Sequence, residues 1–229
     1  MVTTVDTLID KLDTFEIVRD QIGAILVENV AAQKILAAAA GEDPALWDLL
    51  VFVETSKPFE IYLNDPPPSP GAPPIVNVWY QAGRFEPGKS DPIERQAHAA
   101  TYNIDVYGFA SATVDRDDAT QHVTGDYGAA LAAHRGVRLV RNILMAGVNT
   151  YLQLRGVVSG RWPGSIQSFT PQITDDAALR VVGMQLALDV GFNEFSPQIT
   201  PGVLDEVGVQ IFRDGDGKLL AEADFVGLE

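Results

Sequence analysis

The pattern of apolar and polar positions begins with one long amphipathic stretch. Apolar side chains recur at helical spacing over residues 15–40, which predicts a helix with a single buried stripe. The stripe consists of Phe15, Val18, Ile22, Ile25 and Leu26. Asp13 and Glu16 have the spacing of a capping box, and Gly41 suits a left-handed residue at the helix end. The first element is therefore a helix of about 26 residues, roughly 40 Å long.

A second helix is predicted over residues 126–145, with an extension to Tyr151 left open. Its buried stripe consists of Ala133, Val137, Val140 and Leu144. Arg135, Arg138 and Arg141 follow at three-residue spacing and fall on nearly the opposite face. We call these three residues the arginine row.

Strands are predicted where apolar and polar residues alternate or where short apolar runs lie between turn residues. These segments are residues 59–63, 75–82, 97–110, 166–173 and 182–192. Residues 45–53 fit a helix or a strand, and residues 156–164 are expected to be a connection. The strand at residues 97–110 has apolar side chains on both faces, so both faces should be covered.

The last part of the chain differs in character. Prolines at 197 and 201 indicate a linker, and alternating residues around Val209 and Ile211 then precede an Asp-Gly-Asp-Gly turn at 214–217. An isolated hairpin is marginally stable, so we expect it to pair with another sheet. We predict an α+β domain over residues 1–195 and a linker with a hairpin extension over residues 196–229. The domain should hold a mixed, mainly antiparallel sheet of four to five strands packed by two long helices.

Charge limits the partners more than composition does. The chain has 229 residues, of which 46% are apolar, and its 16 basic and 31 acidic residues give a net charge of −15. Such a field repels phosphates and disfavours nucleic-acid and anionic-membrane surfaces, although it also serves solubility. No run of about 18 consecutive apolar residues occurs, so no membrane span is expected. Cysteine is absent, which excludes disulfides and thiolate metal sites.

Candidate chemistry is sparse. His98, His122 and His134 lie on different predicted elements without metal-ligand spacing. The turn at 214–217 resembles the start of a calcium loop, but Phe225 stands where the closing glutamate belongs. We expect no catalytic residue, no metal, no cofactor and no enzymatic activity.

Two segments suggest contacts between subunits. Residues 83–96 contain glycines, prolines and mixed charges, which is typical of a hairpin arm, and Arg84 and Phe85 lie at its start. The like charges of the arginine row repel one another unless a carboxylate-rich surface neutralises them. A solvated helix face explains that row equally well. The candidate interface residues are therefore Arg135, Arg138, Arg141, Arg84, Phe85, Val209 and Ile211.

The order of elements resembles that of the tail terminator (tail completion) proteins of tailed bacteriophages. Residues 102–109 (YNIDVYGF) resemble their third strand, residues 139–144 (LVRNIL) the end of their second helix, and residues 185–190 (QLALDV) their last strand. The likeness spans about residues 15–195. The proline-rich loop at 64–74 and the C-terminal hairpin lie outside the family pattern.

The resemblance implies a structural virion protein, made in the host cytoplasm and placed at the tail and neck. It implies a homohexameric ring that ends the tail tube and joins it to the neck or connector protein. Contacts to tube and sheath proteins are expected, with DNA passing through unbound. Another neck, tube or sheath subunit is the first alternative. An acidic enzyme or ligand-binding domain is the alternative from a different class.

Overall fold

The computed structural model describes residues 10, 12–58, 62, 72–89, 95–112, 124–171 and 180–195. It also describes the backbone of residues 206–212 and 219–226. The chain divides into two compact units, Met1–Ser196 and Pro197–Glu229. The second unit contains an antiparallel hairpin of β6 (Glu206–Phe212) and β7 (Leu219–Val226).

A five-stranded mixed sheet forms the centre of the first unit, in the order β1-β2-β3-β5-β4. Its strands are β1 (Leu50–Val53), β2 (Ile75–Phe85), β3 (Arg95–Ala110), β4 (Val158–Phe169) and β5 (Arg180–Phe195). Among these five strands, β1 and β2 pair in parallel and the other neighbours pair antiparallel. The longest pairing joins β3 and β5, whose alternating side chains point to opposite faces.

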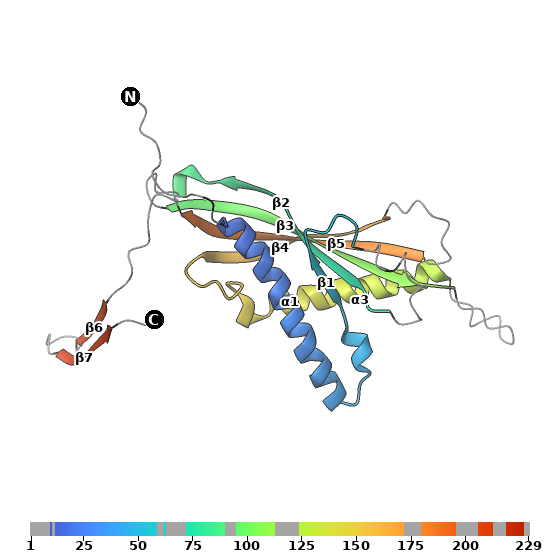
Figure 1. Ribbon diagram of the computed structural model, residues 1–229, viewed down its shortest axis with the longest axis horizontal. Helices are drawn as coiled ribbons and strands as arrows, with labels where there is room; N and C mark the ends of the chain where they lie inside the picture. The colour runs from blue at the N-terminus through green and yellow to red at the C-terminus, as the bar shows by residue number, and fades with distance from the viewer. Residues whose placement is uncertain are drawn as a thin grey trace, which may run out of the picture. The chain divides into compact units, whose positions relative to one another are not determined.

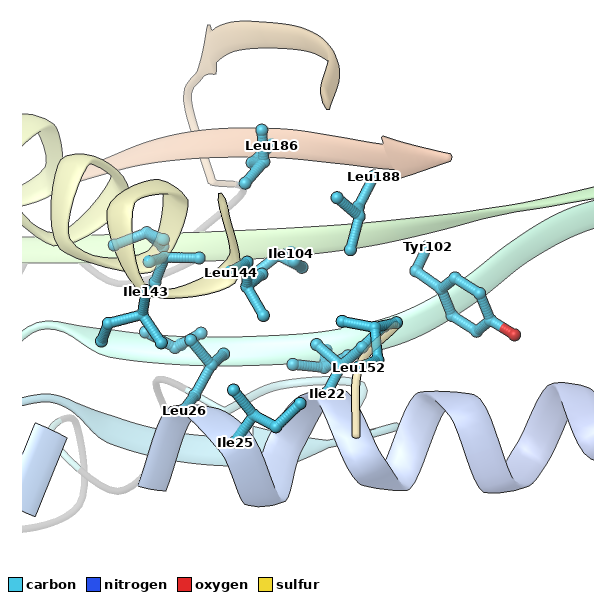
Figure 2. Packing of buried hydrophobic residues seen from close by; sticks show 14 of the residues in the cluster. Ile22, Ile25, Leu26, Tyr102, Ile104, Ile143, Leu144, Leu152, Leu186 and Leu188 are labelled. Atoms are coloured by element: carbon cyan, nitrogen blue, oxygen red, sulfur yellow. The ribbon is translucent and has the colours of Figure 1, made fainter. Parts of the chain in front are cut away.

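Both helices, α1 (Thr14–Ala39) and α3 (Gly125–Met145), pack on the same face of the sheet (Figure 1). The core between them contains branched aliphatic side chains from the helices and from every second strand position. Figure 2 shows Ile22, Ile25 and Leu26 of α1 directed toward the strands, close to Leu144 and Leu152. Burying such side chains contributes about 1.5–3 kcal/mol each.

Specific polar contacts fix the helices on the sheet. The Glu194 carboxylate on β5 accepts the Thr14 backbone N–H at 2.9 and 3.1 Å, and the Tyr102 hydroxyl donates to the Phe15 carbonyl at 2.9 Å. At the other helix, the buried Arg161 guanidinium donates to the Leu144 carbonyl and to the Ala146 carbonyl at 2.7 Å. The bonds to the Thr14 N–H and to the Leu144 and Ala146 carbonyls satisfy backbone groups that a helix end leaves without a partner.

Gly108 allows α3 to lie directly on β3. A Cβ at this position would meet the Ala129 carbonyl oxygen at 2.2 Å and the Ala133 nitrogen at 2.4 Å. Backbone atoms give way far less easily than flexible side chains do. A residue other than glycine would therefore push the helix off the sheet.

The predicted α+β class is confirmed, with two long helices and a mixed five-stranded sheet. Gly41 has the left-handed φ of 76° expected after α1, and α3 ends at Met145 without reaching Tyr151. The connection predicted at residues 156–164 is wrong, because β4 already begins at Val158. Its small residues and Pro163 obscure the strand pattern, and pairing with β5 overrides their weak propensity.

The first strand lies elsewhere than predicted. The ambiguous segment 45–53 contains a 3-10 turn, η1 (Pro44–Trp47), followed by β1. Tyr62, placed in the predicted strand at 59–63, has helical backbone geometry, and the rest of that segment lies outside the described residues.

The expected absence of a membrane-spanning segment stays a prediction. By length and composition alone α1 is apolar enough to cross a membrane, a criterion that core helices also meet. Only 33% of its most apolar window is buried, and this buried part packs against the sheet.

Candidate functional site

The face of the sheet opposite α1 and α3, which we call the helix-free face because neither of these two helices packs on it, contains a polar network that crosses four strands. Trp79 Nε1 on β2 donates to Asp105 Oδ2 on β3 at 2.9 Å, and Gln185 Nε2 on β5 donates to Asp105 Oδ1 at 2.8 Å. Gln167 Nε2 on β4 donates to Gln185 Oε1 at 2.7 Å. Each bond joins neighbouring strands, so the network braces the sheet from one strand to the next.

The Asp105 carboxylate is buried, and hydrogen bonds fix its orientation. Burial raises the pKa of Asp105, while the hydrogen bonds from Gln185, Trp79 and Tyr107 act in the opposite direction. A raised carboxylate pKa is typical of catalytic acids. Here both oxygens already accept bonds from neighbouring strands. This occupancy favours a structural role for the carboxylate.

A shallow hollow lies further along the same face, and we call it the sheet hollow. It is lined by Ala82, Arg84, Ala99, Thr101, Trp162, Asp189 and Gly191. Thr101 Oγ1 donates to Asp189 at 2.6 Å across its floor. The Trp162 side chain, 57% exposed, lies so close to the β4 backbone that a Cβ at Gly160 would meet its ring at 3.0 Å. Small side chains, Ala82, Ala99 and Gly191, therefore form much of the floor of the hollow, which lies between Trp162 and Arg84.

The ends of β2 and β3 form an exposed hairpin, which we call the hairpin end (residues 81–89 and 95–98). Every residue from Gln81 to Phe85 is exposed. The Phe85 ring stacks on His98 at 4.5 Å, and His98 meets the Phe192 ring edge-on at 4.8 Å. Burial lowers the pKa of His98, against the opposing charge of Glu194. Two of the predicted interface residues, Arg84 and Phe85, lie here on opposite faces of β2.

The second half of α1 and the η1 turn form another exposed surface, the α1 tip (residues 27–47). Figure 1 shows this part of α1 extending beyond the sheet. Four of its large apolar side chains are well exposed, namely Val27 (54%), Ile35 (71%), Leu36 (60%) and Leu46 (48%), whereas Val30 and Ala37 are buried. Lys34 pairs with Asp48 at 2.9 Å, and Trp47 Nε1 donates to Glu42 at 3.2 Å, so the turn is fastened to the helix.

The arginine row is split between two environments. Arg138 and Arg141 are exposed, and no ion-pair partner for either occurs among the residues that the structure describes. Arg135 is half-buried. Burial and the charge of Arg138 lower the pKa of Arg135, whereas Asp43 and Glu42 in the α1 tip act in the opposite direction. Arg135 therefore faces acidic groups of its own chain, which leaves Arg138 and Arg141 for a partner.

The remaining candidates are widely separated. Val209 and Ile211 lie in β6 of the second unit, and their side chains are outside the described part. His134 is exposed on α3, while His122 and the turn at 214–217 also lie outside the described residues. Within the described ranges, no group of three or more His, Asp or Glu side chains is placed to hold a metal ion.

Two features of the helix-free face were missed in the sequence. Asp105 and Gln185 are polar residues within strands that are otherwise largely apolar, and that contrast was the available signal for a cross-strand network. Trp162 was assigned to a connection, so its place beside the hollow went unrecognised.

Comparison with known proteins does not assign the chain to a family. No protein-family model matches it, and a search of curated proteins finds no match. The surfaces described above therefore carry the functional proposal.

Proposed function

We propose that this chain is a structural subunit of a tailed-bacteriophage virion that forms a ring at the end of the tail tube. In this role it joins the tail to the neck or connector and lets DNA pass through its lumen. The observation that carries the proposal is the group of exposed apolar side chains on the α1 tip, together with the exposed Phe85 at the hairpin end. Two such surfaces at different places on one subunit suit the head-to-tail contacts that close a ring.

The charge of the chain supports the same role. A net charge of −15 repels phosphates, so a lumen lined by this protein would let DNA slide without binding it. Arg138 and Arg141 are the exception, and a carboxylate-rich neighbour would neutralise them. Partners are then further copies of the chain, the tail tube and sheath proteins, and the neck protein. The proposal includes no catalytic residue and no cofactor.

Imaging of the purified full-length chain tests this function. Mass photometry over a wide concentration range, followed by negative-stain electron microscopy, should give discrete rings of one size. Continuous tubes would favour the alternative of a tube or sheath subunit. A monomer at every concentration would overturn the proposal and favour an acidic enzyme or ligand-binding domain.

A further inference from the structure

We propose that strand β6 of one copy of this chain adds to the open edge of strand β4 in the next copy. The proposal rests on the ring-forming function and names a contact that links neighbouring subunits. Three properties of the two strands support it: their free backbone edges, their lack of charge and their apolar positions.

β4 is the longer of the two edge strands of the five-stranded sheet. It has 12 residues and lies at one end of the strand order, whereas β1 at the other end has four. Among the described residues β4 pairs with β5, and its only other backbone pairing is a bridge between Arg155 and Val158. Its outer edge therefore presents backbone N–H and C=O groups that a further strand can bond.

The exposed part of β4 lacks the charges that protect such an edge. Residues 162–168 are all exposed and none is charged, although 21% of the chain is. Across the sheet, the exposed part of β2 contains Arg84, and the Glu54 carboxylate accepts the Tyr80 backbone N–H at 2.9 Å. Natural sheets use charged side chains to keep foreign strands from their edges. The contrast indicates that β4 is left open for a strand.

The regular part of β4 is the place for an added strand. Pro163 lies in the middle of β4, and the register with β5 shifts between Pro163 and Ile166. Residues 166–169 then pair with residues 186–183 of β5 without a shift. Because proline and bulges interrupt pairing at an edge, we place the contact at residues 166–169.

The C-terminal hairpin has an edge of the same kind. β6 and β7 form a two-stranded sheet of their own, in a compact unit distinct from the one that contains the five strands. Such a sheet is marginally stable in water, and a third strand stabilises it. Residues 207–212 of β6 are uncharged, whereas β7 contains Glu222 and Asp224. The edge of β6, and not that of β7, therefore matches the uncharged edge of β4.

Apolar positions on the two strands favour the same pairing. Alternate residues of β6 from Val207 to Ile211 are apolar, and alternate positions share one face of a hairpin. On β4, Trp162 and Ile166 are 57% and 47% exposed. They point to opposite faces of the sheet, since their partners on β5, Asp189 and Leu186, are three residues apart. In either orientation, the apolar face of β6 therefore removes one of these two side chains from water.

The two edges differ from each other, which suits a ring. Each copy offers one β4 edge and one β6 edge, so its hairpin binds the next copy while its own β4 accepts the previous one. Ten residues, 196–205, join β5 to β6. A segment of that length reaches at most about 36 Å when it is extended, so the hairpin of one copy can reach its neighbour.

Disulfide formation between copies tests the contact, and the chain suits this test because it contains no cysteine. Full-length Ser168→Cys, a small change at an exposed position of β4, is mixed with full-length variants that each have one cysteine at residues 207–211 of β6. After mild oxidation, mass spectrometry identifies the linked peptides. Ser159→Cys is the matched control on β4, at an exposed serine beside the bridged Val158. Glu222→Cys is the control on the hairpin, in the strand beyond β6.

The expected links follow from strand spacing. A disulfide requires Cβ atoms within about 4.5 Å, and each further strand adds about 4.8 Å. At least one position of β6 should therefore link to position 168 at least about tenfold more efficiently than either control links.

The charge that β4 lacks provides a second test without cysteine. Ser168→Lys adds a protecting charge to the edge and should weaken assembly in mass photometry by about tenfold. Ser159→Lys adds the same charge outside the contact and should leave assembly unchanged. Equal assembly of both lysine variants and the wild type would contradict the contact.

Failure of the contact and failure of the proposed function are distinguishable. Rings of the wild type without any link between β4 and β6 would leave the ring standing and overturn this contact. Links between copies that build continuous tubes would support the contact and overturn the ring. Links that form within a chain containing both cysteines, and never in mixtures of the single variants, would assign the hairpin to its own β4 and overturn the exchange between copies.

Discussion

The two halves of α1 have similar apolar side chains but opposite surroundings. In the first half, Val18, Ile22 and Leu26 are completely buried against the sheet. In the second half, Ile35 and Leu36 are mostly exposed although they belong to the same unbroken helix. Figure 1 shows why, since the C-terminal end of α1 extends beyond the sheet.

This difference in burial indicates that the two halves of α1 have different roles. The first half holds the fold together, because its side chains leave water when the sheet forms. In the second half only Val30 and Ala37 are buried, so its exposed apolar residues, Val27, Ile35 and Leu36, add little to the stability of the monomer and require another explanation. The two sheet faces also differ, because the main apolar core lies on the side of α1 and α3. The other side has a smaller apolar cluster of Ile75, Tyr107 and Phe109 beside the polar network and the open hollow.

The largest expected effect contrasts Ile22→Ala with Ile35→Ala. Ile22 is fully buried, so its truncation leaves a cavity and should lower the free energy of unfolding by about 2–5 kcal/mol. The same change at Ile35 should alter it by no more than about 0.5 kcal/mol. Urea denaturation of dilute protein, where assembly does not contribute, measures both values. Equal losses at the two sites would remove the contrast between the halves of α1.

A smaller loss is expected for Asp105→Ala on the helix-free face. Removing the carboxylate leaves Trp79 Nε1 and Gln185 Nε2 without their acceptor, which should cost about 1–3 kcal/mol. Asp126→Ala, at an exposed carboxylate, is the control and should stay within about 0.5 kcal/mol.

The pH dependence of the Asp105 effect has a definite sign. Burial raises the pKa of Asp105 above the ordinary value of 3.8, so the folded chain keeps this proton to higher pH than the unfolded chain does. Its contribution to stability therefore falls as the pH rises through the folded-state pKa. The difference between wild type and Asp105→Ala should widen on acidification toward about pH 4. A gap that narrows there would contradict a buried Asp105.

His98 at the hairpin end should give a weaker effect with the opposite dependence. Burial lowers the pKa of His98 below 6.5, so the unfolded chain takes up a proton that the folded chain resists. Stability from this residue is present above that pH and is lost as the pH falls through the folded-state pKa. His98→Phe should remove this part of the acid sensitivity, whereas His134→Gln, at an exposed position, should not. Thermal unfolding of each variant from about pH 8 to about pH 5 measures this acid sensitivity.

The smallest effect on stability is expected for Arg138→Glu. Arg138 is exposed, so the free energy of unfolding should change by less than about 0.5 kcal/mol. Assembly should nevertheless weaken, because the variant places a carboxylate against a carboxylate-rich neighbour. Light scattering after size exclusion measures the mass of the assembly that Arg138→Glu forms. The control is Arg155→Glu, a change of the same kind at Arg155 in the loop after α3. Unchanged assembly would exclude Arg138 from the interface.

Much of the fold could be predicted because periodicity depends on local backbone geometry. The buried stripes of α1 and α3 and the alternation on β5 follow directly from which side chains face the core. β4 was mostly missed, because a strand with Gly160, Pro163 and Gly164 has little pattern of its own. Its place follows from pairing with β5, which is a long-range contact.

The candidate surfaces could be predicted only in part. Arg84 and Phe85 were recognised as an exposed arm from glycine, proline and charge, and the structure places them at the hairpin end. Arg135 was expected to share an exposed face with Arg138, yet it faces Glu42 and Asp43 from a segment about 90 residues earlier. Helical spacing gives the direction of a side chain and not the identity of a distant neighbour.

The sequence by itself determined the α+β class, the two helices and the acidic surface, since composition and short-range periodicity suffice for these properties. Only the tertiary structure decided that the apolar pattern of α1 continues past the edge of the sheet. It also brought Ala82, Ala99 and Gly191 from three strands into one hollow. Burial depends on which elements lie side by side, and that arrangement arises from contacts between residues far apart in the chain.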